Sequence, residues 1–359
     1  MAAVWPLVHA VTVGNAALGG QGKTPMVRAL ARLARARYAA RPIVATRGVG
    51  ADEDRMLADD ENVSAVLVDG DRGRALAAYL QAAPAAAVQK AVPIGGGVRP
   101  ESGETCSGGG RLPLVLLDDG LQSHGSLTAR RLLMVSAAAR PSLIARVPLA
   151  RAAGRCEVVV VHHADVAGPA AVRAVRDSLR DVPAALLTSR MGNMRLAPWR
   201  GGGRLLADGG RAFVDDVAVL AVSGIGHAAP FHAKLVGMDG TTLRMRASTA
   251  RLQRAGLPLL PARRGGRVDG MDGIAALVPV PFGDHAVFNG ARLATALRLL
   301  RRASPLPPVV VVTEKDAYRK GNAAVLSRLA VLADVFVLHA DLVLDDDGDD
   351  LVDRLVLRQ

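Results

Sequence analysis

Aromatic side chains are scarce in this sequence. Phe, Trp and Tyr make up 3% of the 359 residues, although 50% of the residues are hydrophobic. The core must therefore be built from aliphatic side chains, and the length favours two domains rather than one. Basic clusters interleaved with aromatic residues, which are typical of nucleic-acid-binding modules, are also missing. We therefore expect no nucleic-acid partner.

Cysteine and long apolar runs are equally rare. The two cysteines, Cys106 and Cys156, form no CxxC pair and have no neighbouring ligand set. This argues against a disulfide scaffold and against a zinc site, and favours two free thiols. No apolar run is long enough to span a bilayer, and the first residues are too short for a signal peptide. Since they run straight into the first strand, the sequence leaves open whether the amino terminus is complete.

Basic residues outnumber acidic ones. The chain has 45 Lys and Arg against 33 Asp and Glu, a formal charge of +12. Such a protein is attracted to anionic partners. In the absence of a nucleic-acid module, an anionic membrane surface or an anionic lipid substrate fits this charge well. We therefore expect peripheral membrane association.

Short apolar runs alternate with helical patterns over residues 1–190. The runs are continuous, as expected for parallel strands buried on both faces of a sheet. The expected strands are Val8–Val13, Pro42–Ala45, Ala65–Val68, Leu114–Leu117, Leu132–Val135 and Val158–Val161. Alternating strands and helices predict an α/β domain with a parallel sheet.

Three irregular stretches interrupt this rhythm. Ala82–Arg111 is rich in Gly and predicts a flexible insertion, Met191–Asp216 predicts a domain linker, and Ala247–Asp272 predicts a loop insertion. After the linker the pattern resumes, and residues 217–359 predict a second, smaller α/β domain. Its expected elements are strands at Val217–Val222, Val309–Val312 and Val335–Leu338 and a helix at Ala291–Arg301.

A glycine-rich loop joins the first strand to the first helix. Its glycines allow backbone N–H groups to point at phosphate oxygens, Lys23 supplies a positive charge, and the Thr24 hydroxyl is a magnesium ligand. The strict motif has Gly where Ala17 stands. We predict a P-loop NTPase domain that binds a nucleoside triphosphate and magnesium; the alternative is a plain glycine-rich turn. The expected phosphate-binding residues are Ala17, Leu18, Gly19, Gly20, Gln21, Gly22, Lys23 and Thr24.

Paired acids follow a buried strand. Asp118 and Asp119 come directly after Leu114–Leu117. At the carboxyl end of a strand beside the P-loop strand, such acids hold magnesium. An ordinary turn is the alternative, because Asp and Gly favour turns. With the P-loop present, we predict Thr24, Asp118 and Asp119 as magnesium ligands.

Seven segments occur in a distinctive order. They are VGNAALGGQGKTP, TRGVGADEDRML, LLDDGLQ, VVHHAD, VSGIG, PFGDH and VVTEKDA. The series resembles the tetraacyldisaccharide 4'-kinase family, and its plant and algal branch more than the bacterial one. The resemblance implies transfer of the γ-phosphate of ATP, with Mg²⁺, to the 4'-hydroxyl of a tetraacylated disaccharide 1-phosphate in lipid A biosynthesis. It also implies a P-loop core followed by a smaller carboxy-terminal α/β domain.

The same resemblance assigns roles to single residues. It implies that Asp52 activates the acceptor hydroxyl with His285 as its partner, and that Lys23 and Asp119 complete the catalytic set. Without the resemblance, Asp52 reads as a solvated acid and His285 as a turn histidine. The residues that it places near the substrate are Arg47, Glu53, Gln122 and Asp284.

The sequence departs from the family near the acceptor. Ser123 stands where the family has His, a Pro-Leu-Arg segment is reduced to Arg146–Arg151, and Ala286 follows Asp284 and His285. Two alternatives therefore stay open: a degenerate homologue that binds nucleotide without turnover, and another P-loop small-molecule kinase. The implied location is an organelle such as the mitochondrion in a eukaryote, or the cytoplasmic face of the inner membrane in a bacterium.

Overall fold

The computed structural model divides into two compact units. The first holds Met1–Gly50, Leu57–Met191 and Leu342–Gln359, and the second holds Ala51–Met56 and Gly192–Asp341. The structure describes residues 8–15, 21–48, 51–82, 92–93, 111–119, 129–138, 148–199, 217–226, 228–237, 274–304, 307–345 and 347–357.

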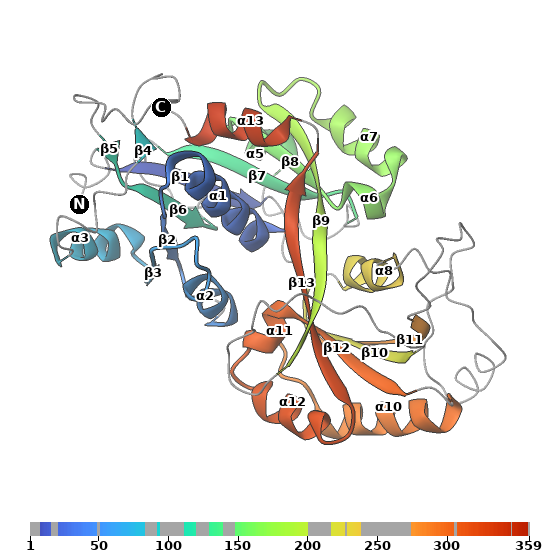
Figure 1. Cartoon of the computed structure of the whole chain (residues 1–359). Coiled ribbons are helices and arrows are strands. Elements are labelled where there is room, and N and C mark those ends of the chain that lie inside the picture. The colour runs from blue at the N-terminus through green and yellow to red at the C-terminus, as the bar shows by residue number, and fades with distance from the viewer. Residues whose placement is uncertain are drawn as a thin grey trace. The chain divides into compact units, whose positions relative to one another are not determined.

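The first unit is built on a parallel sheet (Figure 1), with strand order β9-β8-β7-β1-β6-β2-β3. All neighbouring strands pair in parallel. Every expected strand of this region is confirmed, because runs of Val and Leu suit strands that are buried on both faces. The strands are β1 (His9–Asn15), β2 (Ile43–Thr46), β3 (Ala65–Val68), β6 (Leu114–Asp118), β7 (Arg130–Ser136), β8 (Val158–His162) and β9 (Ala185–Pro198).

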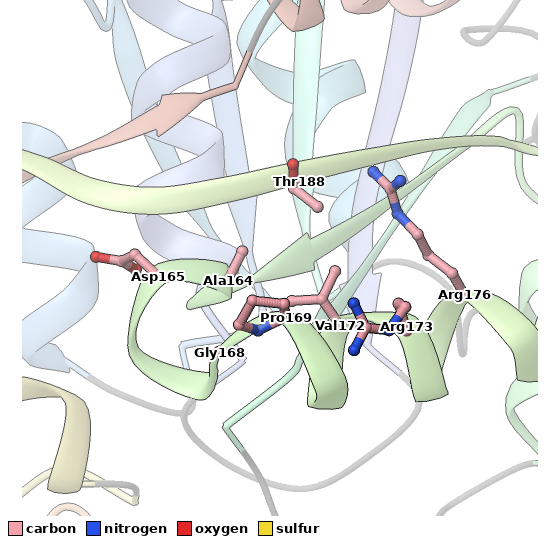
Figure 2. Close-up of a pocket in the computed structure, with 8 residues that line it drawn as sticks. All are labelled: Ala164, Asp165, Gly168, Pro169, Val172, Arg173, Arg176 and Thr188. Atoms are coloured by element: carbon pink, nitrogen blue, oxygen red, sulfur yellow. The ribbon is translucent and has the colours of Figure 1, made fainter.

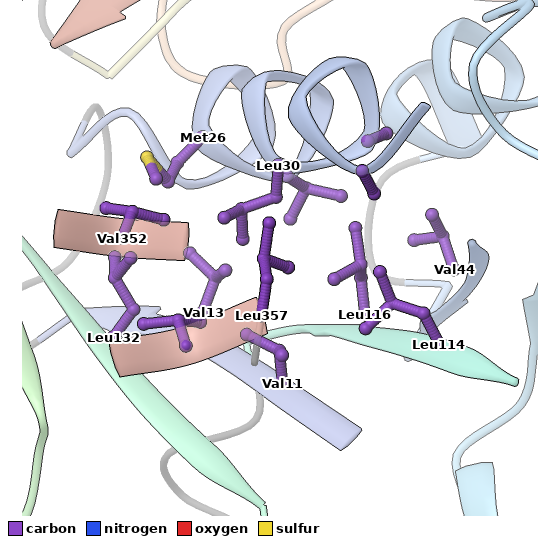
Figure 3. Packing of buried hydrophobic residues seen from close by; sticks show 14 of the residues in the cluster. Val11, Val13, Met26, Leu30, Val44, Leu114, Leu116, Leu132, Val352 and Leu357 are labelled. Atoms are coloured by element: carbon purple, nitrogen blue, oxygen red, sulfur yellow. The ribbon is translucent and has the colours of Figure 1, made fainter. Parts of the chain in front are cut away.

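Helices cover both faces of this sheet. One face packs against α1 (Lys23–Tyr38) and the carboxy-terminal α13 (Gly348–Val352) with its π-helical extension Asp353–Leu357. In Figure 3, Met26 and Leu30 of α1 point at strand residues of the same cluster. The opposite face packs against α3 (Arg72–Ala82), α5 (Leu149–Ala153) and α7 (Pro169–Ser178). The remaining helices of this region are α2 (Ala51–Ala58) and α6 (Ala164–Ala167).

The second unit is a smaller parallel sheet, with strand order β11-β10-β12-β13. Helices α10 (Gly290–Ala303) and α12 (Ala323–Ala330) pack on one face and α8 (Ala229–Gly237) on the other. The short helix α11 (Glu314–Tyr318) follows β12 directly. The strands are β10 (Val217–Ser223), β11 (Ile274–Pro281), β12 (Pro308–Thr313) and β13 (Asp334–Leu344). The fold class, a parallel α/β architecture with a smaller second α/β unit, is thus confirmed.

Two domain boundaries differ from the expectation. Leu342–Gln359 was expected in the second domain but clusters with the first unit. The reason is apolar burial: Val352, Val356 and Leu357 are fully buried in the cluster that contains Leu132. Figure 3 shows Val352 and Leu357 beside this cluster's strand residues. Conversely, Ala51–Met56 was expected in the first domain but clusters with the second unit.

The expected linker and insertion differ in part as well. Within Met191–Asp216, residues 191–198 belong to β9, whose side chains are buried only at intervals, so no continuous apolar run marks it. Residues 200–216 lie outside the described part. Within Ala82–Arg111, Val92–Pro93 (β4) pairs antiparallel with Arg111–Leu112 (β5). Residues 83–91, 94–110 and the predicted loop at 247–272 lie outside the described part.

Within the described ranges, no helix is both long enough and apolar enough to cross a bilayer.

A buried histidine predicts a pH dependence of stability. Burial on α8 lowers the pKa of His232 to about 4, although the carbonyl of Ala221 opposes the shift. An unfolded His takes up its proton near pH 6.5. The unfolded state therefore binds more protons below that pH, and stability falls as the pH drops from about 6.5 to 4, by up to about 3 kcal/mol.

Urea unfolding of the His232→Leu variant tests this expectation. The variant should lose less unfolding free energy than the wild type between pH 7 and pH 4.5. Parallel curves for the two proteins would show that His232 does not contribute to the slope. The buried His9, whose pKa burial also lowers, stays in both proteins and cancels in the comparison.

Candidate functional site

The described end of the glycine-rich loop has strict backbone requirements. Gly22 precedes α1 with φ 84°, a left-handed conformation that favours glycine. A Cβ there would lie 2.5 Å from Cδ2 of His162. Gln21 accepts a hydrogen bond from the backbone N–H of Ser136 at 2.8 Å through its side-chain oxygen. Ala17, Leu18, Gly19 and Gly20 lie outside the described residues.

Substituting this glycine should destabilise the first unit. Gly22→Ala forces an L side chain into the left-handed region, which costs about 1–2 kcal/mol, and drives its Cβ into the His162 ring. We expect a lower urea midpoint and weaker ATP binding. Gly70→Ala is the matched control, because a Cβ at Gly70 meets nothing within 4 Å. Equal midpoints for the two variants would contradict the expectation.

The residues that follow the loop face the acidic pair. Because β1 and β6 are parallel neighbours and Val13 pairs with Asp118, the P-loop and the acids lie at the same edge of the sheet. The Thr24 hydroxyl donates to Oδ2 of Asp118 at 3.4 Å, and Lys23 Nζ lies 3.7 Å from Oδ1 of Asp119. The structure thus brings four predicted site residues together in the first unit.

This donor set suits magnesium. A hydroxyl and carboxylates are hard oxygen ligands, and Mg²⁺ is usually held by one or two carboxylates together with substrate phosphates and waters. Among the described residues, no group of three or more His, Cys, Asp or Glu side chains could hold a metal alone. The edge at Thr24 and Asp118 therefore fits an ion that arrives with a nucleotide.

Arg72 is a residue that the sequence reasoning missed. Its guanidinium is buried and donates to the backbone carbonyl of Asp118 at 2.7 Å. Burial lowers its pKa, and the charge of Arg47 adds to this, while Asp118 and Asp119 oppose the shift. Arg47 therefore belongs to the same neighbourhood as the acidic pair. The predicted Gln122 lies outside the described residues.

Two buried histidines, His162 and His163, lie at the carboxyl end of β8. The rings of His162 and His163 are 3.9 Å apart. His162 Nδ1 lies 2.9 Å from the Ser189 hydroxyl, and His163 Nδ1 lies 3.0 Å from the Ser136 hydroxyl. Since Ser136 also binds Gln21, these contacts link the ends of β7 and β8 to Ser189 within β9 and to the residues just before α1.

The second unit gathers three of the sequence motifs at one edge. The segments VSGIG, PFGDH and VVTEKDA follow β10, β11 and β12, whose carboxyl ends meet because the strands are parallel neighbours. Asp52 and Glu53 of α2 cluster with the same unit. The predicted residues Asp52, Glu53, Asp284 and His285 therefore lie in one cluster, although they are far apart in the sequence.

Asp52 is the buried centre of this cluster, 4% exposed. Its Oδ2 accepts from Arg319 Nη2 at 2.8 Å, and its Oδ1 lies 3.6 Å from Nδ1 of His285. Burial would raise the pKa of Asp52, but the Arg319 hydrogen bond and the charges of Lys315 and Arg319 outweigh it and lower the pKa. The carboxylate is therefore ionised at neutral pH.

Lys315 neutralises the remaining acids. Its Nζ lies 2.8 Å from Oε1 of Glu53 and 3.7 Å from Oδ1 of Asp284. Burial would lower the pKa of Lys315, but Glu53, Asp284 and Asp52 outweigh it and raise the pKa. Lys315 also lies 3.5 Å from Nε2 of His285. The sequence marked Lys315 only as part of a motif and did not indicate this role.

A separate open depression lies along α6, α7 and β9. Its volume is about 520 Å³, and it is lined in part by Asp165, Arg173, Arg176 and Thr188 (Figure 2). None of the predicted site residues lines it. The depression is therefore separate from the two clusters of predicted site residues described above.

Comparisons with known proteins bear on the family of this chain. Residues 3–248 match the family model LpxK, described as tetraacyldisaccharide-1-P 4'-kinase. A tetraacyldisaccharide 4'-kinase from Pseudomonas paraeruginosa is 32% identical over 148 residues, which are 36% of this chain and 36% of the relative. The chain thus aligns with about a third of the length of that relative.

A solved structure shares the fold over nearly the whole chain. It is a crystal structure of LpxK from Aquifex aeolicus in complex with ATP, with a TM-score of 0.50 and 15% identity, and the match covers 97% of this chain and 88% of that one. At this identity the likeness speaks to the fold alone. The family model, however, spans more than half of the chain. This chain therefore belongs to the tetraacyldisaccharide-1-P 4'-kinase family.

Proposed function

We propose that this protein transfers the γ-phosphate of ATP to the 4'-hydroxyl of a tetraacyldisaccharide 1-phosphate. The observation that carries the proposal is the contact of Thr24 and Lys23, at the start of α1, with the acidic pair Asp118 and Asp119. The second unit, by itself, presents a buried and ionised carboxylate at Asp52. Family membership supports the acceptor class. The ATP-bound LpxK from Aquifex aeolicus supports the choice of nucleotide.

The first unit supplies the donor contacts. The N–H groups at the start of α1 and the positive end of the helix bind phosphate oxygens, and Lys23 neutralises the β- and γ-phosphates. Thr24, Asp118 and Asp119 would hold magnesium, which supplies further charge neutralisation on the transferred group. Arg72 and Arg47 keep the surroundings of the acidic pair positive. Phosphoryl transfer depends chiefly on such positioning and charge.

The second unit supplies the proton acceptor. The acceptor oxygen forms a bond to the γ-phosphorus while the bond from that phosphorus to the β,γ-bridging oxygen breaks, and ADP leaves. The hydroxyl proton passes to the carboxylate of Asp52. His285, beside Oδ1 of Asp52, orients that carboxylate or takes the proton onward. Glu53 and Asp284, held by Lys315, and Gln122 complete the proposed substrate contacts.

A transfer assay tests the proposal. Purified protein is incubated with labelled ATP, magnesium and tetraacyldisaccharide 1-phosphate, and the labelled lipid is measured. We expect transfer by the wild type and background for Lys23→Ala and Asp52→Ala. Wild-type transfer no higher than in these variants would refute the kinase activity. Transfer to soluble acceptors instead would indicate another P-loop small-molecule kinase.

A degenerate homologue is the second candidate, favoured by Ser123, the reduced Pro-Leu-Arg segment and Ala286. It would bind ATP with normal affinity and yet show no turnover. Calorimetric titration with ATP alongside the transfer assay distinguishes the two candidates.

Peripheral binding to an anionic membrane is the proposed location of this activity. The support is the net charge of +12 and an acylated substrate. Co-sedimentation with vesicles rich in phosphatidylglycerol should exceed that with phosphatidylcholine vesicles, and salt should weaken it. Equal binding to both vesicles would contradict an electrostatic attachment.

A further inference from the structure

We propose that Arg319 is a positioning residue for Asp52, holding its carboxylate in one orientation with one oxygen left for the proton transfer. The inference rests on the function proposed above. Neither the motif pattern nor the sequence-based assignment of site residues includes Arg319.

The contacts of Arg319 occupy one side of the Asp52 carboxylate. Both Nε, at 3.2 Å, and Nη2, at 2.8 Å, donate to Oδ2 of Asp52. Both side chains are buried. With Oδ2 taken up by the guanidinium, Oδ1 is the oxygen that lies beside His285. A planar guanidinium presents its donors in a fixed fork, so it restricts the rotation of the carboxylate as well as neutralising it.

Arg319 is itself held from three directions. Its Nη1 donates to Oδ1 of Asp316 at 2.8 Å and to the backbone carbonyls of Ala286 at 2.8 Å and Gly224 at 3.2 Å. Asp316 in turn accepts from the N–H of Gly224 and from the hydroxyl of Thr313. A Cβ at Gly224 would lie 2.6 Å from Nη1 of Arg319. The ends of β10, β11 and β12 thus converge on one guanidinium.

The surroundings of Asp52 make this contact measurable. Burial alone would raise its pKa, and the Arg319 hydrogen bond is the largest of the influences that lower it. Removing the guanidinium should therefore raise the pKa of Asp52. The acidic limb of the pH–activity profile, where kcat falls as Asp52 becomes protonated, should then move to higher pH. The charged groups around this carboxylate are Arg319, Lys315, His285, Asp316, Glu53 and Asp284.

Two substitutions separate charge from geometry. Arg319→Met removes both, so we expect kcat to fall about 100-fold near neutral pH and the acidic limb to rise by about one pH unit. Arg319→Lys keeps a positive charge without the fork, so we expect kcat to fall about tenfold with the limb close to that of the wild type. KM for ATP should stay within about twofold in both, because the contacts of Arg319 are with the second unit.

Arg298→Met is the matched control. Arg298 is exposed on α10 and bonds only to Ala294 and Thr295 of its own helix in the described contacts. It should retain wild-type kcat and pH profile. If Arg319→Met gives the same kcat and profile as Arg298→Met, the positioning role is wrong. If Arg319→Met does not fold, Arg319→Lys still decides, because unchanged kcat in that variant overturns the role of the fork.

A readout without turnover keeps this test independent of the kinase activity. The titration of the Asp52 carboxyl carbon is followed by ¹³C NMR in the wild type and in each folded variant, with Asp52→Asn used for assignment. A higher pKa in Arg319→Met, or a changed carboxyl shift in Arg319→Lys, supports the role. Unchanged titration and shift overturn it. Absent transfer by the wild type with an altered Asp52 titration would refute the proposed function and leave the contact established.

Discussion

Asp52→Asn should lower kcat for lipid phosphorylation about a thousandfold, because a carboxamide cannot accept the hydroxyl proton. The side chain keeps its shape, and the amide oxygen can still accept from Arg319. Transition-state stabilisation through proton transfer is the main quantity lost. KM for ATP should therefore change little. The measurement is steady-state kinetics with the acylated disaccharide, together with ATP titration of the variant.

A nearby exposed acid provides the control for Asp52. Asp59 follows the same helix and is exposed, so Asp59→Asn should match the wild type. If Asp52→Asn retains a tenth or more of wild-type kcat while binding ATP normally, Asp52 is not the proton acceptor. If both variants lose activity, the loss reflects the fold of this region and not the chemistry.

Lys23→Met should lower kcat/KM for ATP about 100- to 1,000-fold, through the loss of a charge positioned at the developing negative charge on the transferred phosphate. Lys23 lies 3.7 Å from Asp119 and is about a quarter exposed, so the substitution leaves no deeply buried charge behind. We therefore expect an unchanged melting temperature in the absence of nucleotide. Kinetics and thermal unfolding with and without ATP measure both effects.

Lys320→Met is the control for Lys23, since Lys320 is exposed. It should keep wild-type kinetics and the stabilisation by ATP. Lys23→Met should lose most of that stabilisation, because a ligand that binds the native state raises its stability according to affinity. Stabilisation equal to that of the wild type would show that Lys23 does not contact the phosphates.

The local elements of this protein follow from its sequence. Strands such as β6 and β8 are predictable because buried parallel strands are continuously apolar. The helix after the P-loop is predictable from its apolar spacing, with Met26 and Leu30 inward. β9 escaped prediction because polar residues interrupt its apolar pattern.

The carboxy-terminal segment shows a second reason why the sequence alone did not predict part of the fold. α13 is short, and its sequence does not reveal which sheet its apolar side chains cover. That depends on the packing of Val352 and Leu357 into the cluster of the first unit. The same holds for Ala51–Met56. There Glu53 pairs with Lys315 and Asp52 pairs with Arg319, both of the second unit. Long-range partners decide both assignments.

The sequence by itself therefore determined the class of fold, the P-loop with its acidic pair, and the family resemblance that drew attention to Asp52 and His285. The tertiary structure decided which charges meet. Arg319 is 267 positions from Asp52 in the sequence, and Arg72 is 46 positions from Asp118. A motif records residues that are neighbours along the chain. A buried ion pair depends on which strand ends are adjacent in the sheets, and only the folded protein establishes that adjacency.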